Sequence, residues 1–428
     1  MTLSPYTWDD GVPATIQQHS IAKHEVLREY LVAYLQTLVT RPAQDALSVT
    51  LIDGFAGGGV YQHQDTKELV LGSPFIFLEA AKEAEALIAI GRQKPLRWNL
   101  DYFFVEKNNK AHRHLKCALE ERGYGPRIER DIHLLNGSFD KHAEKLIKFV
   151  KEKSPINGRS IFLLDQYGYS HVPASQIRSI FRTLPTAEVI LTFAVDAFIN
   201  FASDNEATRR ILKRIDLPDV LKGRTLEDIK HVEKDFRLYI QSCFYKELVE
   251  QCGAKFFTVF FIRTTGHGDY WLVHLSQHPK ARDVMTTVHW SKNNHFIHYG
   301  DAGLDMFRTL GYSTSADSRF TGQNELGFCF DANAGKASID ALVNQLSPLI
   351  HARPDGITFG ELFTAHCNSS PANGQKYRLA LERLIAHKEV TATSKDGARR
   401  FRASTITGGD LLKVSNQTVF SFQPIHPS

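Results

Sequence analysis

The sequence predicts a mixed α/β protein, with a doubly wound, mostly parallel sheet and a smaller C-terminal domain of another type. Between residues 20 and 193, short apolar segments alternate with segments of helical periodicity, and this alternation is typical of βαβ units. Two adjacent strand patterns and then a basic, helix-rich segment follow. A chain of 428 residues is long enough for two or three domains.

Composition narrows the classes of protein to which the chain can belong. The hydrophobic content of 43% and charged content of 23% are ordinary for a globular protein, and a net charge of +4 permits nucleic-acid binding without requiring it. We find neither an apolar run of about 18 residues nor a signal-peptide layout, so we expect no membrane contact. The five cysteines are scattered, which indicates a reducing cytoplasm rather than a zinc site: Cys117, Cys243, Cys252, Cys329 and Cys367.

The first expected element is a helix from about Ser20 to Val39, after a polar arm of residues 1–19. Ser20 has the residue type that caps the orphan amides of a helix start. Apolar residues recur at helical spacing through this segment and give it one apolar face. Lys23 and His24 lie near the helix start, and packing or solvation is the ordinary role for such a histidine.

The first expected strand, Val49 to Asp53, leads directly into a glycine-rich loop, Asp53-Gly54-Phe55-Ala56-Gly57-Gly58-Gly59. Glycine lacks a Cβ, so another molecule can approach the backbone closely. Ligands of open α/β sheets bind outside the carboxyl ends of the strands. The loop therefore predicts a nucleotide-cofactor site, although a glycine-rich surface turn has a similar pattern.

The next three strand patterns also end in polar residues. Asp101 to Lys107 ends at Glu106, and one carboxylate can accept hydrogen bonds from both hydroxyls of a ribose. The third strand, within Arg127–Leu135, precedes a polar segment that suits an adenine amine, and Ile161–Leu164 precedes Asp165 and Tyr167. The predicted cofactor-binding residues are Asp53, Gly54, Phe55, Ala56, Gly57, Gly59, Glu106, Ser138 and Phe139.

The remaining elements of this domain continue the alternation and end in an antiparallel hairpin. Polar insertions are expected at residues 61–71 and 201–224. Helices are expected at Pro74–Ile90, Asn108–Arg122, Lys141–Lys153, Ala174–Leu184, Leu226–Cys252 and Lys280–Ser291. Further strands are expected at Glu188–Phe193, Phe256–Arg263 and Tyr270–Ser276.

This series of motifs resembles a Rossmann-like S-adenosylmethionine-dependent methyltransferase, and more narrowly the three-Cys-motif partner (TcmP) family. The resemblance covers residues 19 to 300 approximately, and it implies a sheet ending in a hairpin, S-adenosylmethionine as cofactor and a three-Cys-motif protein as partner. Gln166 stands where the family carries proline. The matching segments are Lys23–Tyr34, Asp53–Gly59, Gly72-Ser73-Pro74, Val105-Glu106-Lys107, Asp165-Gln166-Tyr167-Gly168 and Trp271–Met285.

Asp165 and Tyr167 are the predicted catalytic residues. Methyl transfer depends on positioning the acceptor; Asp165 has the chemistry to hold an exocyclic amine, and Tyr167 to stack on a base that has been flipped from a duplex. The sequence lacks a Pro-Cys dipeptide, which argues against cytosine-carbon methylation through a cysteine. Because of Gln166, a non-catalytic cofactor-binding partner and a DNA-binding defence-system subunit stay open, as does a strand-end cap for Asp165.

Residues 301–335 are expected to connect this domain to a winged helix at 336–428. Helices at Ala337–His351, from Ile357, and at Asn373–His387 precede strands at Glu389–Ser394 and Arg399–Ala403; in such a fold the third helix and the wing usually face DNA. Docking of a protein is the alternative. His295 and His298 lack further ligands, so we expect no metal site. The predicted nucleic-acid-binding residues are Lys376, Arg378, Arg383, Lys395, Arg399 and Arg400.

Overall fold

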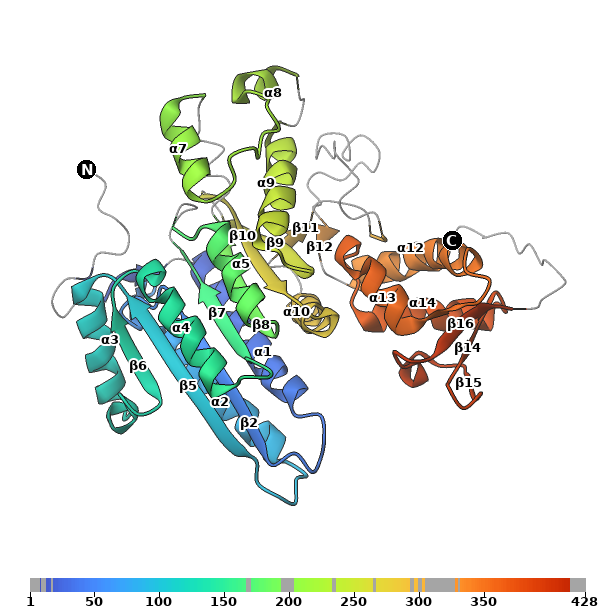
Figure 1. The fold of residues 1–428 in the computed structure, drawn as a ribbon, viewed down its shortest axis with the longest axis horizontal. Helices are drawn as coiled ribbons and strands as arrows, with labels where there is room; N and C mark the ends of the chain where they lie inside the picture. The colour runs from blue at the N-terminus through green and yellow to red at the C-terminus, as the bar shows by residue number, and fades with distance from the viewer. Residues whose placement is uncertain are drawn as a thin grey trace. The chain divides into compact units, whose positions relative to one another are not determined.

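The computed structural model describes residues 8, 13–16, 18–166, 171–193, 204–232, 236–264, 267–292, 296–298, 302–304, 328–329 and 332–415. The chain forms two compact units (Figure 1). The large unit holds residues 1–298 and 310–329, and the small unit holds residues 299–309 and 330–428. Within the described residues, no helix is both long and apolar enough to span a membrane.

The large unit is built on a nine-stranded sheet with the order β12-β11-β9-β10-β8-β7-β2-β5-β6. Strands β6, β5, β2, β7 and β8 are parallel, whereas β10 lies between β8 and β9 and is antiparallel to both. This is the strand order of the Rossmann-like methyltransferase fold, and it confirms the predicted fold class. The strands are β2 (Ala46–Asp53), β5 (Arg97–Glu106), β6 (Ile132–Asn136), β7 (Ser160–Leu164), β8 (Ala187–Phe193), β9 (Phe256–Thr264), β10 (His267–Ser276), β11 (Phe296–His298) and β12 (Phe328–Cys329).

Helices cover the sheet in two groups. Helix α1 packs against α2 and α10, and α5 packs against α4 and α9 (Figure 1). The side chain of Asn108 caps α3 by accepting hydrogen bonds from the amides of Lys110 and Ala111. The helices are α1 (Gln18–Leu38), α2 (Ser73–Ala89), α3 (Asn109–Glu121), α4 (Phe139–Lys153), α5 (Ala174–Thr183), α7 (Glu206–Arg214), α8 (Leu226–Val232), α9 (Phe236–Cys252) and α10 (Pro279–Ser291).

The two segments expected to be polar insertions contain regular structure. Residues 61–71 belong to a hairpin of β3 (Val60–His63) and β4 (Leu69–Leu71), and β1 (Thr15–Ile16) pairs parallel with β3. The second expected insertion contains α7. Strand β3 is partly exposed over most of its length, so its polar sequence lacks the alternation that identifies a half-buried strand.

The small unit has the three helices and the hairpin of a winged helix. Its four-stranded sheet has the order β13-β16-β14-β15, and a capping box between Thr358 and Glu361 starts α13. Strands β13 and β16 were not predicted. The elements are α12 (Ala332–His351), β13 (Ile357–Thr358), α13 (Phe359–His366), α14 (Gly374–Ala386), β14 (Val390–Thr393), β15 (Arg399–Arg400) and β16 (Leu411–Val414).

Candidate functional site

The acidic strand ends predicted from the sequence lie along one edge of the sheet. Strands β2, β5, β6 and β7 are parallel, and Asp53 is in register with Phe104 on one side and Leu163 on the other. Glu106 is in register with Asn136 at the end of β6. Parallel neighbours end at the same edge, so the topology itself brings these polar residues together.

Glu106 links the glycine loop to the end of β5. Its Oε2 accepts a hydrogen bond from the Gly57 amide at 2.9 Å, and its Oε1 accepts one from the Asn108 amide at 2.7 Å. The side chain is partly exposed. Each carboxylate oxygen offers about two acceptor positions, so Glu106 retains capacity for hydroxyl donors from a ligand.

Asp53 is buried at the start of the glycine loop. Its Oδ1 accepts a hydrogen bond from the Phe55 amide at 3.0 Å, whereas Oδ2 is buried with no hydrogen-bond partner among the residues that the structure describes. Burial raises the pKa of Asp53 to about 7, and the nearby negative charges of Asp165 and Glu106 act in the same direction. A hydrogen bond with the Ser73 side chain lowers the pKa and offsets part of this rise. Asp53 therefore holds the start of the glycine loop from within the protein.

The glycine loop is packed closely by aromatic side chains. Gly57 and Gly59 have φ values of +61° and +77°, which favour glycine. A Cβ at Gly58 would overlap the ring of Trp8, and one at Gly57 would overlap the Tyr61 hydroxyl. Trp8 is 5% exposed and meets Tyr61 edge-on, with ring centroids 5.2 Å apart. The contact of Trp8 with this loop was not predicted, because the N-terminal arm has no periodic pattern.

The other predicted cofactor residues lie at the same edge of the sheet. Ala56 is buried, and its amide donates to the Val105 carbonyl at 3.0 Å. Phe139 is buried, and a Cβ at Gly54 would lie only 3.0 Å from its ring. Ser138 is the N-cap of α4, and its side chain makes no capping hydrogen bond.

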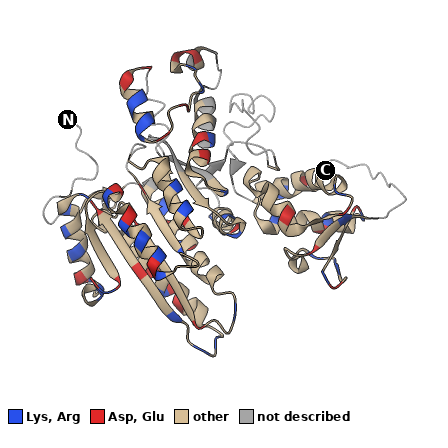
Figure 2. Ribbon diagram, viewed as in Figure 1, with Lys and Arg blue, Asp and Glu red and all other residues tan. Residues whose placement is uncertain are grey.

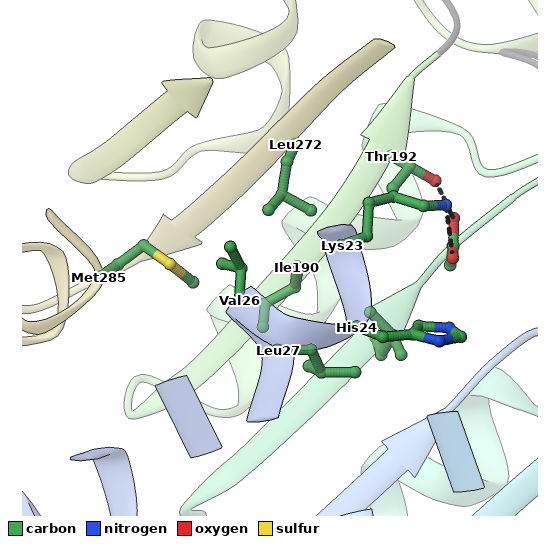
Figure 3. A pocket seen from close by; sticks show the side chains of 10 residues that line it. Lys23, His24, Val26, Leu27, Ile190, Thr192, Leu272 and Met285 are labelled. Carbon is green, nitrogen blue, oxygen red and sulfur yellow. Dashed lines mark hydrogen bonds and ion pairs between the residues drawn. The ribbon is translucent and has the colours of Figure 1, made fainter. Parts of the chain in front are cut away.

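Asp165, at the end of β7, is bound by side chains from two other elements (Figure 3). Lys23 Nζ on α1 lies 2.7 and 2.8 Å from the two carboxylate oxygens, and Thr192 Oγ1 on β8 donates to Oδ1 at 2.6 Å. Burial alone would raise the pKa of Asp165, but Lys23 and Thr192 hold that pKa below its ordinary value. Asp165 is therefore an anionic hydrogen-bond acceptor at neutral pH.

A small pocket lies beside this ion pair (Figure 3). His24 lines it, and burial lowers the pKa of His24 to about 4, with the Lys23 charge adding to the effect. The His24 Nδ1 is buried and has no hydrogen-bond partner within the described part of the chain. The other side of the pocket is apolar and is lined by Val26, Leu27, Leu163, Ile190, Leu272 and Met285.

Gln166 points into the protein. Its Nε2 donates to the Thr192 carbonyl at 3.4 Å, and its Oε1 accepts from the amides of His171 and Val172 at 2.8 and 3.2 Å. The side chain is 4% exposed, so it braces the segment after the strand end from within. Tyr167, the second predicted catalytic residue, lies outside the described residues.

The predicted nucleic-acid-binding residues of the small unit divide into two groups. Arg378 Nε donates to the Ile406 carbonyl at 2.9 Å and its guanidinium covers the Phe359 ring at 4.8 Å. Arg383 forms an ion pair with Asp340. Arg400 lies 3.3 Å from Asp410. Lys376 is partly buried, and burial lowers its pKa to about 8. Lys395 and Arg399 are exposed.

Comparison with known proteins identifies the C-terminal region. The family model of the GMT-like wHTH domain matches residues 314–397, which agrees with the winged helix seen in the structure. No curated protein matches the sequence. None of these comparisons matches the narrower TcmP family.

Among the described residues, no group of three His, Cys, Asp or Glu side chains is placed to hold a metal ion.

Several solved structures are similar to the chain at low scores. Protein LPL1258 from Legionella pneumophila has 10% identity and a TM-score of 0.33, covering 61% of this chain and 89% of its own. The O-methyltransferase from Bacillus cereus in complex with SAH has 11% identity and a TM-score of 0.25, covering 57% of this chain and 80% of its own. Because these scores are low, the strand order of the sheet, and not the superpositions, defines the fold.

Proposed function

We propose that the large unit binds S-adenosylmethionine at the strand ends and methylates an exocyclic amine of a nucleic-acid base. The observation that carries the proposal is Glu106, whose carboxylate joins the Gly57 amide to the end of β5 at 2.9 Å and keeps acceptor capacity. Glu106 would accept hydrogen bonds from the ribose hydroxyls, as a strand-end acid does in related folds. The cofactor would supply an activated methyl group.

Asp165 is the proposed acceptor for the substrate amine. Its lowered pKa keeps it ionised, so it accepts and does not donate hydrogen bonds. Lys23 already contacts both of its oxygens, so an incoming amine must share the carboxylate with Lys23 or displace it. The winged helix is the reason to propose nucleic acid as the substrate class.

Calorimetric titration with S-adenosylhomocysteine tests the cofactor site. We expect wild-type binding, and at least about tenfold weaker binding by Glu106→Ala, because hydrogen bonds to a charged group contribute about 1.5–3 kcal/mol. Glu121→Ala, which removes an exposed carboxylate from α3, is the matched control and should bind like the wild type. Equal affinity in all three proteins would reject the assignment of Glu106.

A radiolabelled methyl-transfer assay on mixed DNA and RNA tests the reaction. We expect incorporation by the wild type and its loss in Asp165→Asn, which keeps the shape of the side chain but removes its charge. Incorporation unchanged by Asp165→Asn would reject the role of Asp165.

A second function is favoured by the ion pair itself. Since Lys23 and Thr192 already engage Asp165, the large unit would serve as a cofactor-binding partner without turnover. The resemblance to the TcmP family implies that its partner would be a three-Cys-motif protein. Cofactor binding without methyl transfer, both with and without the partner, would favour this function over the enzyme.

A further inference from the structure

The recognition helix of the winged helix, α14, has its arginines engaged within its own domain. Arg378 binds the Ile406 carbonyl and covers Phe359, and Arg383 pairs with Asp340. Glu382, on the same helix, accepts a hydrogen bond from the Ala403 amide at 2.6 Å. Both arginines of this helix are therefore held by groups of their own domain, and of the two, Arg383 has a carboxylate partner among the described residues.

The wing, by which we mean the β14–β15 hairpin and the residues that follow it as far as Arg402, has the opposite character. Lys395, Arg399 and Arg402 are exposed, and their side chains make no hydrogen bond or ion pair with another residue that the structure describes. Phe401 lies between Arg399 and Arg402 along the chain, and it is 64% exposed. Among the described residues of the small unit, it is the large hydrophobic side chain that is exposed to solvent. Figure 2 shows this basic wing, and also Lys and Arg on α3, α4 and α5 of the large unit.

The chain on both sides of Phe401 is held in place. Arg400 pairs with Asp410, which is 2% exposed and also accepts a hydrogen bond from the Thr407 amide at 2.7 Å. On the other side, the Ala403 amide is bound by Glu382. The exposure of Phe401 is thus a consequence of an anchored backbone, which presents the ring to solvent at a defined position.

We propose that the wing, and not α14, is the nucleic-acid-binding element, and that Phe401 stacks on an unpaired base while Arg399 and Arg402 contact phosphates. This inference rests on the proposed function only in taking nucleic acid as the ligand. Proteins bind single-stranded nucleic acid through aromatic rings that stack on the bases and cations that contact the phosphates. Base stacking contributes about 1–3 kcal/mol per base, and each phosphate contact releases counterions from the strand. The occupant is therefore a nucleic acid with unstacked bases.

Fluorescence anisotropy with a labelled single-stranded oligonucleotide and its duplex, using the full chain, tests this inference. We expect the single strand to bind more tightly, Phe401→Ala to weaken that binding roughly tenfold, and Phe401→Trp to retain it. Arg399→Gln and Arg402→Gln should each flatten the slope of log affinity against log salt by about 0.7. Ile156→Ala, which removes an 88% exposed apolar side chain from the large unit, should change nothing.

The outcomes separate this inference from the proposed function. Single-strand binding that is insensitive to Phe401→Ala but lost in Arg383→Gln would overturn the wing assignment and leave nucleic acid as the ligand. A preference for the duplex would overturn stacking on an unpaired base. No binding to either probe at low salt would overturn both nucleic-acid proposals and indicate protein docking, while S-adenosylhomocysteine binding would still test the cofactor site. Thermal unfolding midpoints within a few degrees of the wild type show that each variant is folded.

Discussion

Charged side chains gather at one edge of the sheet in the large unit, whereas several arginines of the winged helix are bound to their own domain. Glu106 and Asp165 follow parallel strands, so the strand order places them together whatever their neighbours are. Arg378 and Arg383 lie on a helix, and their long side chains reach acceptors that only the packed domain provides. The sheet topology therefore determines where a strand-end residue lies, whereas the partner of an arginine on a helix depends on how the whole domain packs.

The largest expected effect concerns Asp53 and pH. Its pKa is raised to about 7 in the folded protein from 3.8 when unfolded, so this carboxyl holds more proton in the folded state between these values, and its own contribution to stability falls as pH rises from 4 to 7. The loss attributable to this group is up to about 4 kcal/mol. Urea unfolding across this range should show a weaker fall in Asp53→Asn, and parallel curves for the two proteins would contradict the buried carboxylate.

Removing the cation beside Asp165 should have the next largest effect. Lys23→Met leaves the carboxylate without its ion-pair partner, and because this pair is only partly buried we expect a cost of at most about 3 kcal/mol, the lower end for buried pairs. The double variant Lys23→Met/Asp165→Leu should recover part of this loss. Arg28→Gln, which breaks a pair with Glu83 at an exposed position, should cost less than about 1 kcal/mol in urea unfolding. Equal costs for the two single variants would contradict the buried pair.

Loss of the Gln166 side chain should cost about 2 kcal/mol. Gln166→Ala removes the acceptor of the His171 and Val172 amides, and the Val172 amide is buried, so leaving it unsatisfied is expensive. Hydrogen exchange should accelerate more at these two amides than in the core of β2, where exchange follows the global stability. Unchanged protection of both amides would show that Gln166 does not brace this segment.

The smallest effect sharpens the comparison in the winged helix. Arg378→Gln should lower the unfolding free energy by about 1 kcal/mol, because it loses a hydrogen bond and a cation–π contact. Nucleic-acid affinity and its salt slope should not change. A flatter salt slope with unaltered stability would place Arg378 on the ligand instead.

Much of the fold followed from the sequence, and the remainder depended on contacts that no local pattern records. The apolar strands that end at Asp53, Glu106 and Asp165 were predicted because a buried parallel strand has a continuous apolar run. The short strands β13 and β16 gave no periodic signal. The packing of Trp8 on the glycine loop and the partners of Arg378 depend on residues far along the chain, so sequence spacing could not reveal them.

A crystal structure of the chain with S-adenosylhomocysteine is the most direct test of the strand-end site. The account predicts electron density for the ligand along the ends of β2 and β5, with its ribose hydroxyls within hydrogen-bond distance of the Glu106 carboxylate. Ligand density elsewhere on the protein, or a ribose that makes no contact with Glu106, would contradict it.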